Sequence, residues 1–222
     1  MPHLQSNELM AMSQPNELKQ EQEQPVVIHL LAGGQSRRMG LNKVDLMLGC
    51  LPLAQWAKCS AASLEVGEVN MIRKDRRPGM GPLAGMETGM LSRPAKTHLF
   101  LSCDMPFVSS RTMHELLETS AKHQRIACMH HLGYPGFPIA LPHQRLDGIG
   151  DMLDAGEFRL RRLLDEPTTL RFDWMEEDAK EACNINTPEA FAEARDWVHQ
   201  EGVMAPIRER QKPLICLRVM GT

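Results

Sequence analysis

Residues 31–43, LAGGQSRRMGLNK, combine three glycines with two arginines and a lysine directly after the apolar run PVVIHL. Because glycine lacks a Cβ, the backbone N–H groups of such a loop can approach a ligand and converge on phosphate oxygens. Arg37, Arg38 and Lys43 would add the positive charge that a triphosphate needs. The loop matches neither GxxxxGK[ST] nor GxGxxG, so it is neither a standard P-loop nor a dinucleotide fingerprint. On its own, a glycine-rich basic loop is more often an ordinary solvated turn than a ligand site.

A second candidate segment, SCDMPF at 102–107, follows the apolar run THLFL. A carboxylate at the end of a buried strand, followed by a proline that ends the strand, projects toward a ligand crevice. Mg²⁺ in proteins is bound by one or two carboxylates together with substrate phosphates and water. The sequence therefore predicts Asp104 as a magnesium ligand. The alternative is that Asp104 only caps the following turn.

Two further segments place polar groups beside glycine or proline. In DRRPGMGPLAG (75–85), Asp75 could accept hydrogen bonds from a base or ribose, and Gly81 would let a flat ring approach. The alternative is a helix-entry loop with proline in the first turn. In NINTP (184–188), Asn184 and Asn186 offer donors and acceptors on one side of an extended segment, while Thr187 can cap the last helix.

Elements of two kinds alternate along the chain and would position these segments. Short apolar runs predict strands at 26–32, 69–72, 97–102, 126–129, 137–141 and 170–172. Helical spacing predicts helices at 53–64, 83–91, 109–122, 145–155, 158–164 and 188–200. Strands that alternate with helices indicate a doubly wound α/β sandwich, whose ligands bind beyond the carboxyl ends of the strands. The polar segments follow the strands, as this arrangement requires.

Composition limits the class of protein. The 222 residues suit one domain at 25–201, and the Gln-, Glu- and Asn-rich stretch 1–24 predicts a disordered tail. Residues 202–222 form a second tail. The formal charge of −3 argues against a nucleic-acid binder, and the longest apolar runs are too short for a membrane span. Six scattered cysteines without CxxC spacing indicate reduced thiols in a cytoplasmic protein.

Together, the segments resemble one family. LAGGQSRRMGLNK, GPLAGM, CDMPF and NINTPEAF, in this order, resemble the molybdenum cofactor guanylyltransferases of the Rossmann-like nucleotidyltransferase superfamily. LDAGEFRLRRLLDE at 153–166 is also similar to a segment of these enzymes, and the resemblance covers residues 26–198. Guanylyl enzymes read LAGG where the sister cytidylyltransferases read LAAG, so Gly33 favours the guanylyl branch. The resemblance implies a three-layer α/β/α fold with a mainly parallel sheet.

The resemblance also implies an activity. GMP would pass from GTP to the terminal phosphate of molybdenum-bound molybdopterin, pyrophosphate would be released, and Mg²⁺ would be the cofactor. We expect a monomer that interacts with molybdopterin-synthesis proteins and molybdoenzymes. By motif match, Asp75 would meet the guanosine end of GTP. The residues implied in nucleotide binding are Leu31, Ala32, Gly33, Gly34, Lys43, Asp75, Gly81 and Asp104.

Three of the matched residues would be catalytic. Lys43 would hold phosphate, Asp104 would hold Mg²⁺ near the α-phosphate, and Arg38 would stabilise the departing pyrophosphate. Asn184 and Asn186 would lie on the pterin side. The side chains of three arginines, on a predicted helix, either assist the second anionic substrate or form a solvated face: Arg159, Arg161 and Arg162.

The chain departs from the family pattern in the segment 65–81. The family usually has two strands there, whereas this segment has room for one, and Asn70 is the candidate for an asparagine that normally lies near the base. Asn42 also stands where an aspartate is common. Two alternatives therefore remain open. The chain could be a non-catalytic homologue that binds nucleotide, cofactor or a partner enzyme, or a sister enzyme that transfers CMP.

Overall fold

A computed structural model describes residues 24–33, 43–131, 133–175 and 178–200. The predicted tails, 1–24 and 202–222, lie outside this part apart from Gln24. The described residues form a six-stranded sheet of order β4-β1-β5-β7-β6-β8. Its strands are β1 (Gln24–Leu31), β4 (Glu68–Ile72), β5 (Ala95–Ser102), β6 (Ala127–His131), β7 (Tyr134–Pro142) and β8 (Leu170–Asp173).

The sheet is mostly parallel. β1 pairs in parallel with both β4 and β5, and β6 pairs in parallel with β8. β7 runs antiparallel to its two neighbours, β5 and β6. A separate two-stranded hairpin, β2 (Met47–Leu48) and β3 (Leu51–Pro52), follows a short 3₁₀ helix, η1 (Lys43–Asp45). The sequence did not predict the hairpin, because two-residue strands give no apolar period.

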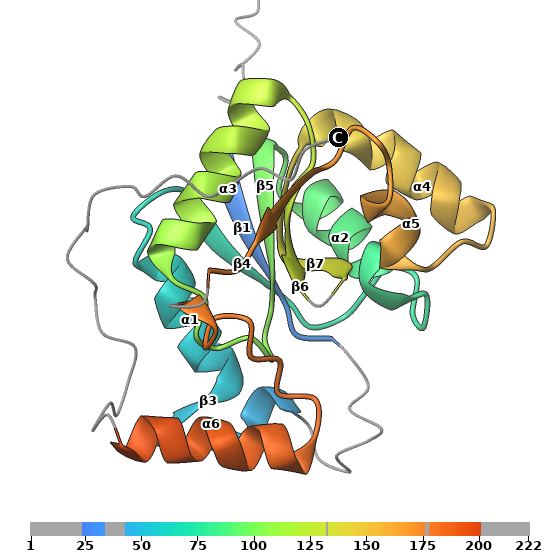
Figure 1. Ribbon diagram of the computed structural model, residues 1–222. Coiled ribbons are helices and arrows are strands. Elements are labelled where there is room, and N and C mark those ends of the chain that lie inside the picture. The colour runs from blue at the N-terminus through green and yellow to red at the C-terminus, as the bar shows by residue number, and fades with distance from the viewer. Residues whose placement is uncertain (1–23, 34–42, 132, 176–177, 201–222) are drawn as a thin grey trace, which may run out of the picture.

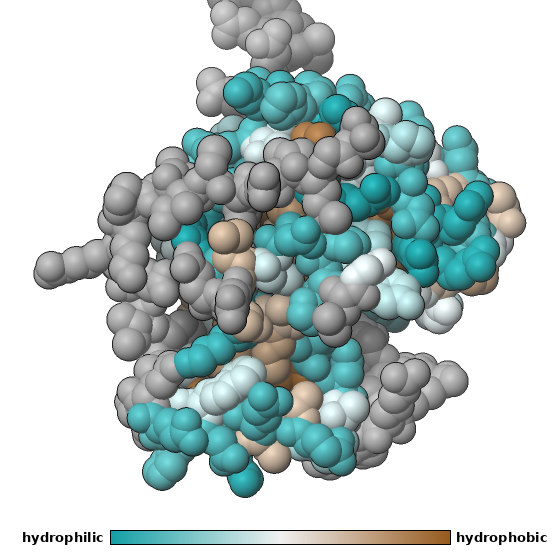
Figure 2. Space-filling view, in the orientation of Figure 1, coloured by the Kyte–Doolittle hydropathy of each residue, from teal (hydrophilic) through white to brown (hydrophobic). Residues whose placement is uncertain are grey.

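Helices cover both faces of the sheet, so the predicted three-layer fold is confirmed (Figure 1). α1 (Leu53–Ala62) and α3 (Ser110–His123) cover one face. α2 (Gly81–Ser92), α4 (Leu146–Asp154) and α5 (Leu160–Leu164) cover the other. α6 (Pro188–Gln200) lies apart from the sheet and packs in a third cluster beside β2 and the start of α1. The face shown in Figure 2 is mainly hydrophilic, with a small apolar patch next to α6.

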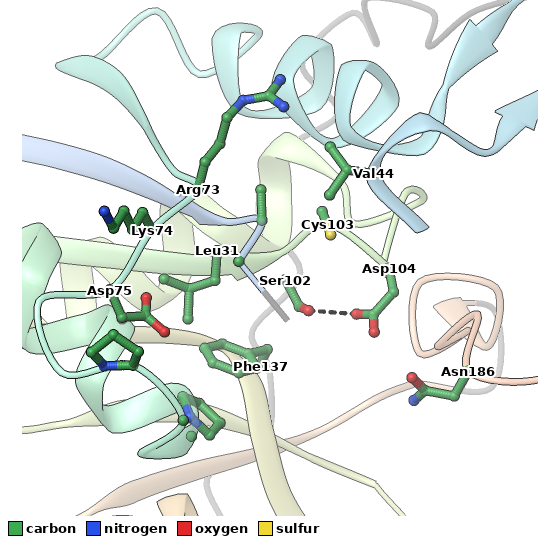
Figure 3. A pocket seen from close by; sticks show the side chains of 17 residues that line it. Leu31, Val44, Arg73, Lys74, Asp75, Ser102, Cys103, Asp104, Phe137 and Asn186 are labelled. Carbon is green, nitrogen blue, oxygen red and sulfur yellow. Dashed lines mark hydrogen bonds between the residues drawn. The ribbon is translucent and has the colours of Figure 1, made fainter. Parts of the chain in front are cut away.

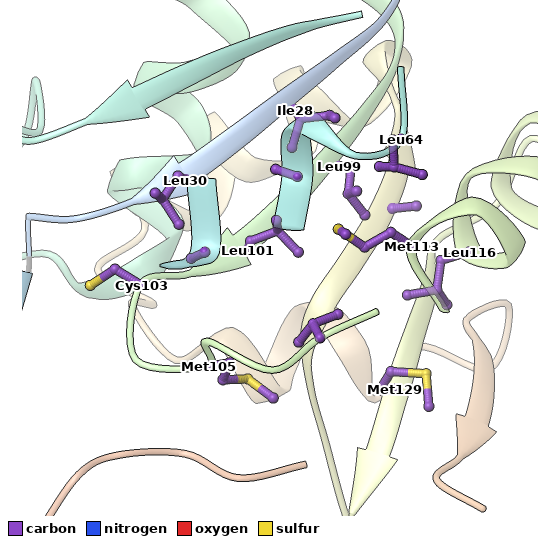
Figure 4. Packing of buried hydrophobic residues seen from close by; sticks show 14 of the residues in the cluster. Ile28, Leu30, Leu64, Leu99, Leu101, Cys103, Met105, Met113, Leu116 and Met129 are labelled. Atoms are coloured by element: carbon purple, nitrogen blue, oxygen red, sulfur yellow. The ribbon is translucent and has the colours of Figure 1, made fainter. Parts of the chain in front are cut away.

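The apolar runs are continuous because the central strands are buried on both sides. Ile28 and Leu30 of β1 and Leu99 of β5 project into the core under α1 and α3 (Figure 4). Phe100, the next residue of β5, projects to the opposite core under α2. Alternate side chains of one strand therefore belong to different layers, as the two-residue period of a strand requires.

One helix begins later than the sequence predicts. The expected helix at 158–164 starts instead at Leu160, after Phe158 and an extended Arg159. The carboxylate of Glu157 accepts hydrogen bonds from both the backbone N–H and the side chain of Arg159. This local contact holds the chain outside the helix. Among the described helices, none is long and apolar enough to cross a membrane.

The chain changes direction across the sheet at β1. From β1 it passes through α1 to β4 on one side of β1, and from β4 through α2 to β5 on the other side. Loops leaving the carboxyl ends of these strands therefore diverge. In open α/β sheets, the crevice at such a switch point is where ligands bind. A ligand is therefore expected to bind at the residues directly after β1, β4 and β5.

Candidate functional site

A cavity of about 640 Å³ opens at the carboxyl ends of β4, β1 and β5 (Figure 3). The ends of these strands and the residues that follow supply most of its wall, and β7 and the segment before α6 complete it. Its lining residues are Leu31, Ala32, Gly33, Val44, Arg73, Lys74, Asp75, Pro78, Gly79, Gly81, Pro82, Gly85, Ser102, Cys103, Asp104, Phe137 and Asn186.

Most of the residues singled out in the sequence meet at this cavity. Those that line it are Leu31, Ala32, Gly33, Asp75, Gly81, Asp104 and Asn186. Asn184 does not line it: its side chain is exposed, and its carbonyl accepts the N–H of Asn186 at 2.8 Å. Gly34, Arg38 and the side chain of Lys43 lie outside the part of the chain that the structure describes.

Asp104 sits in a tight turn directly after β5. The hydroxyl of Ser102 donates a hydrogen bond to Oδ1 of Asp104, and the N–H of Met105 donates to the carbonyl of Ser102 at 3.2 Å. The carbonyl of Asp104 accepts the N–H of Ile185 at 2.9 Å. These bonds tie the turn to the segment that carries Asn186, so the two cavity residues are held in one local framework.

The donor set around Asp104 suits a cation shared with a phosphorylated ligand. Within the described ranges, no three His, Cys, Asp or Glu side chains lie close enough together to hold a metal ion. The described residues therefore contain no metal site built from three or more such side chains. The single carboxylate of Asp104, on the cavity wall, fits Mg²⁺, which takes its other ligands from substrate phosphates and water.

Asp75 lies on the opposite side of the cavity, in the loop that connects β4 to α2 (Figure 3). Burial raises the pKa of its carboxyl group above the ordinary value. Two contacts fasten this loop to α2: the N–H of Arg76 donates to Oγ1 of Thr88 at 2.9 Å, and Nε of Arg77 lies 3.1 Å from Oε2 of buried Glu87. The carboxylate of Asp75 is therefore presented by an anchored loop.

Glycines allow the cavity walls to approach one another. A Cβ at Gly33 would lie 3.2 Å from the carbonyl oxygen of Arg73 and 3.6 Å from Oδ1 of Asp75. Gly81 has a φ of +70°, and a Cβ there would lie 3.1 Å from the carbonyl oxygen of Phe158. The sequence suggested that Gly81 makes room for a flat ring. That role stays a prediction: Gly81 lines the cavity, and its positive φ also forms a left-handed turn packed against Phe158.

Several lining residues were not predicted as functional. Arg73 and Lys74 follow the last residue of β4 directly, but their side chains point away from the cavity (Figure 3). Ser102 lies in the motif that drew attention to Asp104, and its hydrogen bond to that carboxylate could have been expected from their spacing. Phe137 belongs to β7, whose antiparallel direction brings the beginning of the strand to the cavity edge.

The structure does not bring Asn70 to the cavity, so it is not the stand-in that the sequence suggested. Its side-chain Nδ2 lies 3.3 Å from Nδ1 of His29 and donates to Oγ of Ser92 at 3.1 Å. Both contacts lie on the α2 side of the sheet. β4 is the edge strand of the described sheet, in keeping with the single strand expected in the shortened segment.

The three arginines of the 153–166 segment do not line the cavity either. Arg159 pairs with Glu157 at 2.6 Å, and Arg161 pairs with Asp165 at 3.1 Å. Arg162 lies 3.9 Å from the same Glu157. All three side chains are more than half exposed, so the solvated-face interpretation is the one that this geometry favours.

Comparison with known proteins places the chain in a family. Residues 28–171 match the MobA-like NTP transferase domain, which is more than half of the chain. The chain belongs to the MobA-like NTP transferase family. It is therefore a nucleotidyltransferase, and its homologues include molybdenum cofactor guanylyltransferases. The matched range includes β1, β4 and β5, the strands whose ends form the cavity.

Individual relatives agree with this assignment. The molybdenum cofactor guanylyltransferase of Rhodobacter capsulatus is 26% identical over 188 residues, covering 77% of this chain and 95% of the relative. A "probable molybdenum cofactor guanylyltransferase" of Carboxydothermus hydrogenoformans is 32% identical, but the match spans only 44% of this chain and 55% of that protein. The fold is similar to that of molybdopterin-guanine dinucleotide biosynthesis protein A from Archaeoglobus fulgidus, with a TM-score of 0.64 at 19% identity, covering 78% and 99% of the two chains.

Proposed function

We propose that this nucleotidyltransferase transfers GMP from GTP to the terminal phosphate of molybdenum-bound molybdopterin and releases pyrophosphate. The observation that carries the proposal is the cavity at the switch point of the sheet, with Asp75 on one side, Asp104 opposite and Asn186 beyond it. A nucleotide with its guanosine end at Asp75 would direct its phosphates toward Asp104. The names of several homologues support the choice of substrates.

The chemistry requires no nucleophile from the protein. An oxygen of the acceptor phosphate would attack the α-phosphorus of GTP, forming a new phosphoanhydride bond while the bond between the α- and β-phosphates breaks. Pyrophosphate leaves with the released electron pair. Such transfers depend on positioning and on neutralising the negative charge that gathers between the two substrates. The described lining of the cavity offers a carboxylate that could hold a cation, together with an amide and glycine backbone that could position the substrates.

Charge neutralisation would come from two basic residues and a cation. Asp104 would hold Mg²⁺, which supplies positive charge at the phosphates when bound. Lys43 would hold phosphate and Arg38 would stabilise the departing pyrophosphate, as the family motif implies. Gly33 would let the nucleotide lie close to the end of β1. Asn186, next to the Asp104 turn, would contact the acceptor, whereas Asn184 would act through the backbone bond that its carbonyl accepts.

A transfer assay tests the proposal. The full chain is mixed with Mg²⁺, molybdenum-bound molybdopterin and GTP that carries a radioactive α-phosphate. Label in the dinucleotide product, with an equal amount of pyrophosphate, is expected for the native chain and should be lost in Asp104→Asn. CTP in place of GTP tests the CMP-transferring alternative. Transfer from CTP in preference to GTP would contradict the guanylyl assignment.

One structural feature keeps the non-catalytic alternative worth testing. Because β4 is the edge of the described sheet, no further strand of that sheet covers the cavity on the β4 side. If this leaves the base weakly held, the chain would bind GTP or the cofactor without transferring GMP. Calorimetric titration with GTP and Mg²⁺, followed by a pyrophosphate assay after molybdenum-bound molybdopterin is added, separates the cases: binding without pyrophosphate release would support a binding protein, and binding with release would support the enzyme.

A further inference from the structure

The segment before α6 is bonded to both ends of the turn that leads from β5 to α3. At the first end, the N–H of Ile185 donates to the carbonyl of Asp104 at 2.9 Å. At the other end, the N–H of Ser109 donates to Oε2 of Glu181 at 2.9 Å. Residues 181–185 therefore span residues 104–109 as a brace. Asn186 follows this brace directly, and Asp104 lies within the braced turn.

Glu181 makes two hydrogen bonds in the brace. Its Oε2 accepts a second hydrogen bond, from Oγ1 of Thr112 at 2.8 Å, and its residue is only 8% exposed. Burial raises the pKa of its carboxyl group, while the bonds from Ser109 and Thr112 act in the opposite direction. A buried carboxylate is costly unless its hydrogen bonds are satisfied, and the bonds from Ser109 and Thr112 offset that cost here.

The arrangement resembles a capping box supplied from a distant part of the chain. Ser109 is the N-cap of α3, and its Oγ accepts the N–H of Thr112 at 3.2 Å. In an ordinary capping box, a Glu or Gln at the Thr112 position would accept the N–H of the N-cap residue. Here Glu181, 72 residues further along the chain, does so instead. The docked segment around Glu181 thus satisfies the backbone N–H of the N-cap residue of α3.

An ion pair fixes the direction of the docked segment. Arg111, in the first turn of α3, pairs with Asp178, and both side chains are mostly buried. The N–H of Glu181 donates to the carbonyl of Asp178 at 2.8 Å, so the backbone turns between the two acidic residues. Ile185, fully buried, then closes the brace at Asp104. The path from Asp178 to Asn186 is therefore held at its beginning, middle and end.

We propose that Glu181 is a positioning residue that sets the placement of Asn186 relative to Asp104. Through this brace it would control how the acceptor phosphate meets the nucleotide held at Asp104. The inference rests on the proposed guanylyl transfer, which it deepens by assigning a residue to acceptor alignment. Glu181 does not line the cavity and would not touch either substrate. Its loss should therefore affect the acceptor and the transfer step, and leave nucleotide binding intact.

Two variants of the full chain separate hydrogen bonding from charge. Glu181→Ala removes the acceptor for Ser109 and Thr112. Glu181→Gln keeps it, because one amide oxygen can accept both bonds that Oε2 now accepts. In Glu181→Ala we expect the acceptor KM to rise about tenfold or more and kcat to fall, since small misplacements of reacting groups are costly. The Kd for GTP with Mg²⁺ should stay within about twofold of native, because the nucleotide contacts are unchanged. Glu181→Gln should restore most of the activity.

A matched control removes general loss of stability as an explanation. Leu153→Ala truncates a buried side chain of α4, in the layer on the other side of the sheet. It should lower the melting temperature at least as much as Glu181→Ala while leaving the acceptor KM unchanged. Equal effects of the two variants on the acceptor KM would overturn the proposal. So would a Glu181→Ala variant with native kinetics, or one whose loss appears in the Kd for GTP alone.

Amide hydrogen exchange gives a reading that does not depend on activity. Glu181→Ala should speed exchange at Ile185 by about tenfold or more, because the brace would open locally without unfolding of the sheet. Exchange in β1 and β5 should be unchanged. If the native chain transfers no GMP, the proposed function is wrong, and the exchange at Ile185 still shows whether Glu181 holds the brace. Unchanged exchange at Ile185 would overturn the positioning role itself.

Discussion

The hydroxyl of Ser102 and the carboxylate of Asp104 are joined by a hydrogen bond across the turn that ends β5 (Figure 3). A hydrogen bond to an ionised carboxylate is stronger than one between neutral groups, so it restricts the orientation of the side chain. Asp104 is therefore oriented toward the cavity before any ligand binds. A preoriented carboxylate loses less freedom when it binds a cation, which favours tight and well-placed binding.

Asp104→Asn should reduce GMP transfer by about 10²–10³-fold, the range typical for removing a group that stabilises charge in a transition state. The amide has nearly the same shape, so the fold should persist. Ser102→Ala should reduce transfer only by about 3–10-fold, because the carboxylate stays and only its orientation is lost. Rates measured over a Mg²⁺ titration check both, and Ser102→Ala should need more Mg²⁺. Native rates in Asp104→Asn would show that this carboxylate holds no catalytic cation.

Gly33→Ala should weaken GTP binding by about tenfold, on the order of 1.4 kcal/mol, since the new Cβ meets backbone that cannot easily move. The atom it would meet is the carbonyl oxygen of Arg73, at 3.2 Å. Gly136→Ala is the matched control, because no atom lies within 4 Å of a Cβ at that position. Calorimetric titration of both variants checks the prediction. Native affinity in Gly33→Ala would mean that the two strand ends have room for a side chain.

Local sequence predicts the parts of this site that depend on position within an element. Leu31 ends a buried strand, and Ala32, Gly33 and Asp104 follow buried strands. Strands buried on both faces give long apolar runs that are easy to recognise. The order of elements also predicts that these strand ends meet, because parallel strands share one carboxyl edge. The roles proposed for these residues in nucleotide and metal binding come from the family motifs.

What the sequence does not predict depends on contacts between distant segments. Phe137 reaches the cavity because β7 is antiparallel, and nothing in its own apolar pattern shows the direction of the strand. Asn70 lies in a segment whose pattern fits a strand. Which face of the sheet its side chain lies on depends on the pairing of β4 with β1. Glu181 is acidic like many surface residues. Only the fold reveals that it caps a helix 72 residues earlier in the chain.

The stability of the protein should fall as the pH drops below about 6.5, the pKa of an unfolded histidine. His29 and His98 are buried and hydrogen-bonded to each other, with ring nitrogens 2.9 Å apart. Burial, and then the neighbouring His98, lower the pKa of His29 to about 3. Burial, and then the neighbouring His143, lower the pKa of His98 to about 4. The unfolded chain therefore binds more protons than the folded one in this range, and acid favours unfolding.

The expected slope is about 1.4 kcal/mol per pH unit for each histidine once the pH is well below 6.5. Urea unfolding at several pH values between 7.5 and 5.0 measures it, in a range where most carboxylates stay ionised. The double variant His29→Leu/His98→Leu should flatten the profile. A profile equally steep in the double variant would assign the acid sensitivity to other groups.

Arg77→Ala should destabilise the protein and weaken GTP binding together, because Arg77 pairs with Glu87 on α2 and Asp154 on α4. The carboxylate of Glu87 is only 7% exposed, so removing its partner leaves a buried charge uncompensated, at a cost of about 1–3 kcal/mol. The loop that carries Asp75 would also lose an anchor. Asp154→Ala is the control: its side chain is 67% exposed, so its pair with Arg77 should contribute less than about 1 kcal/mol. Urea unfolding and GTP titration of both variants test this, and equal losses in the two would show that Glu87 is not the important partner of Arg77.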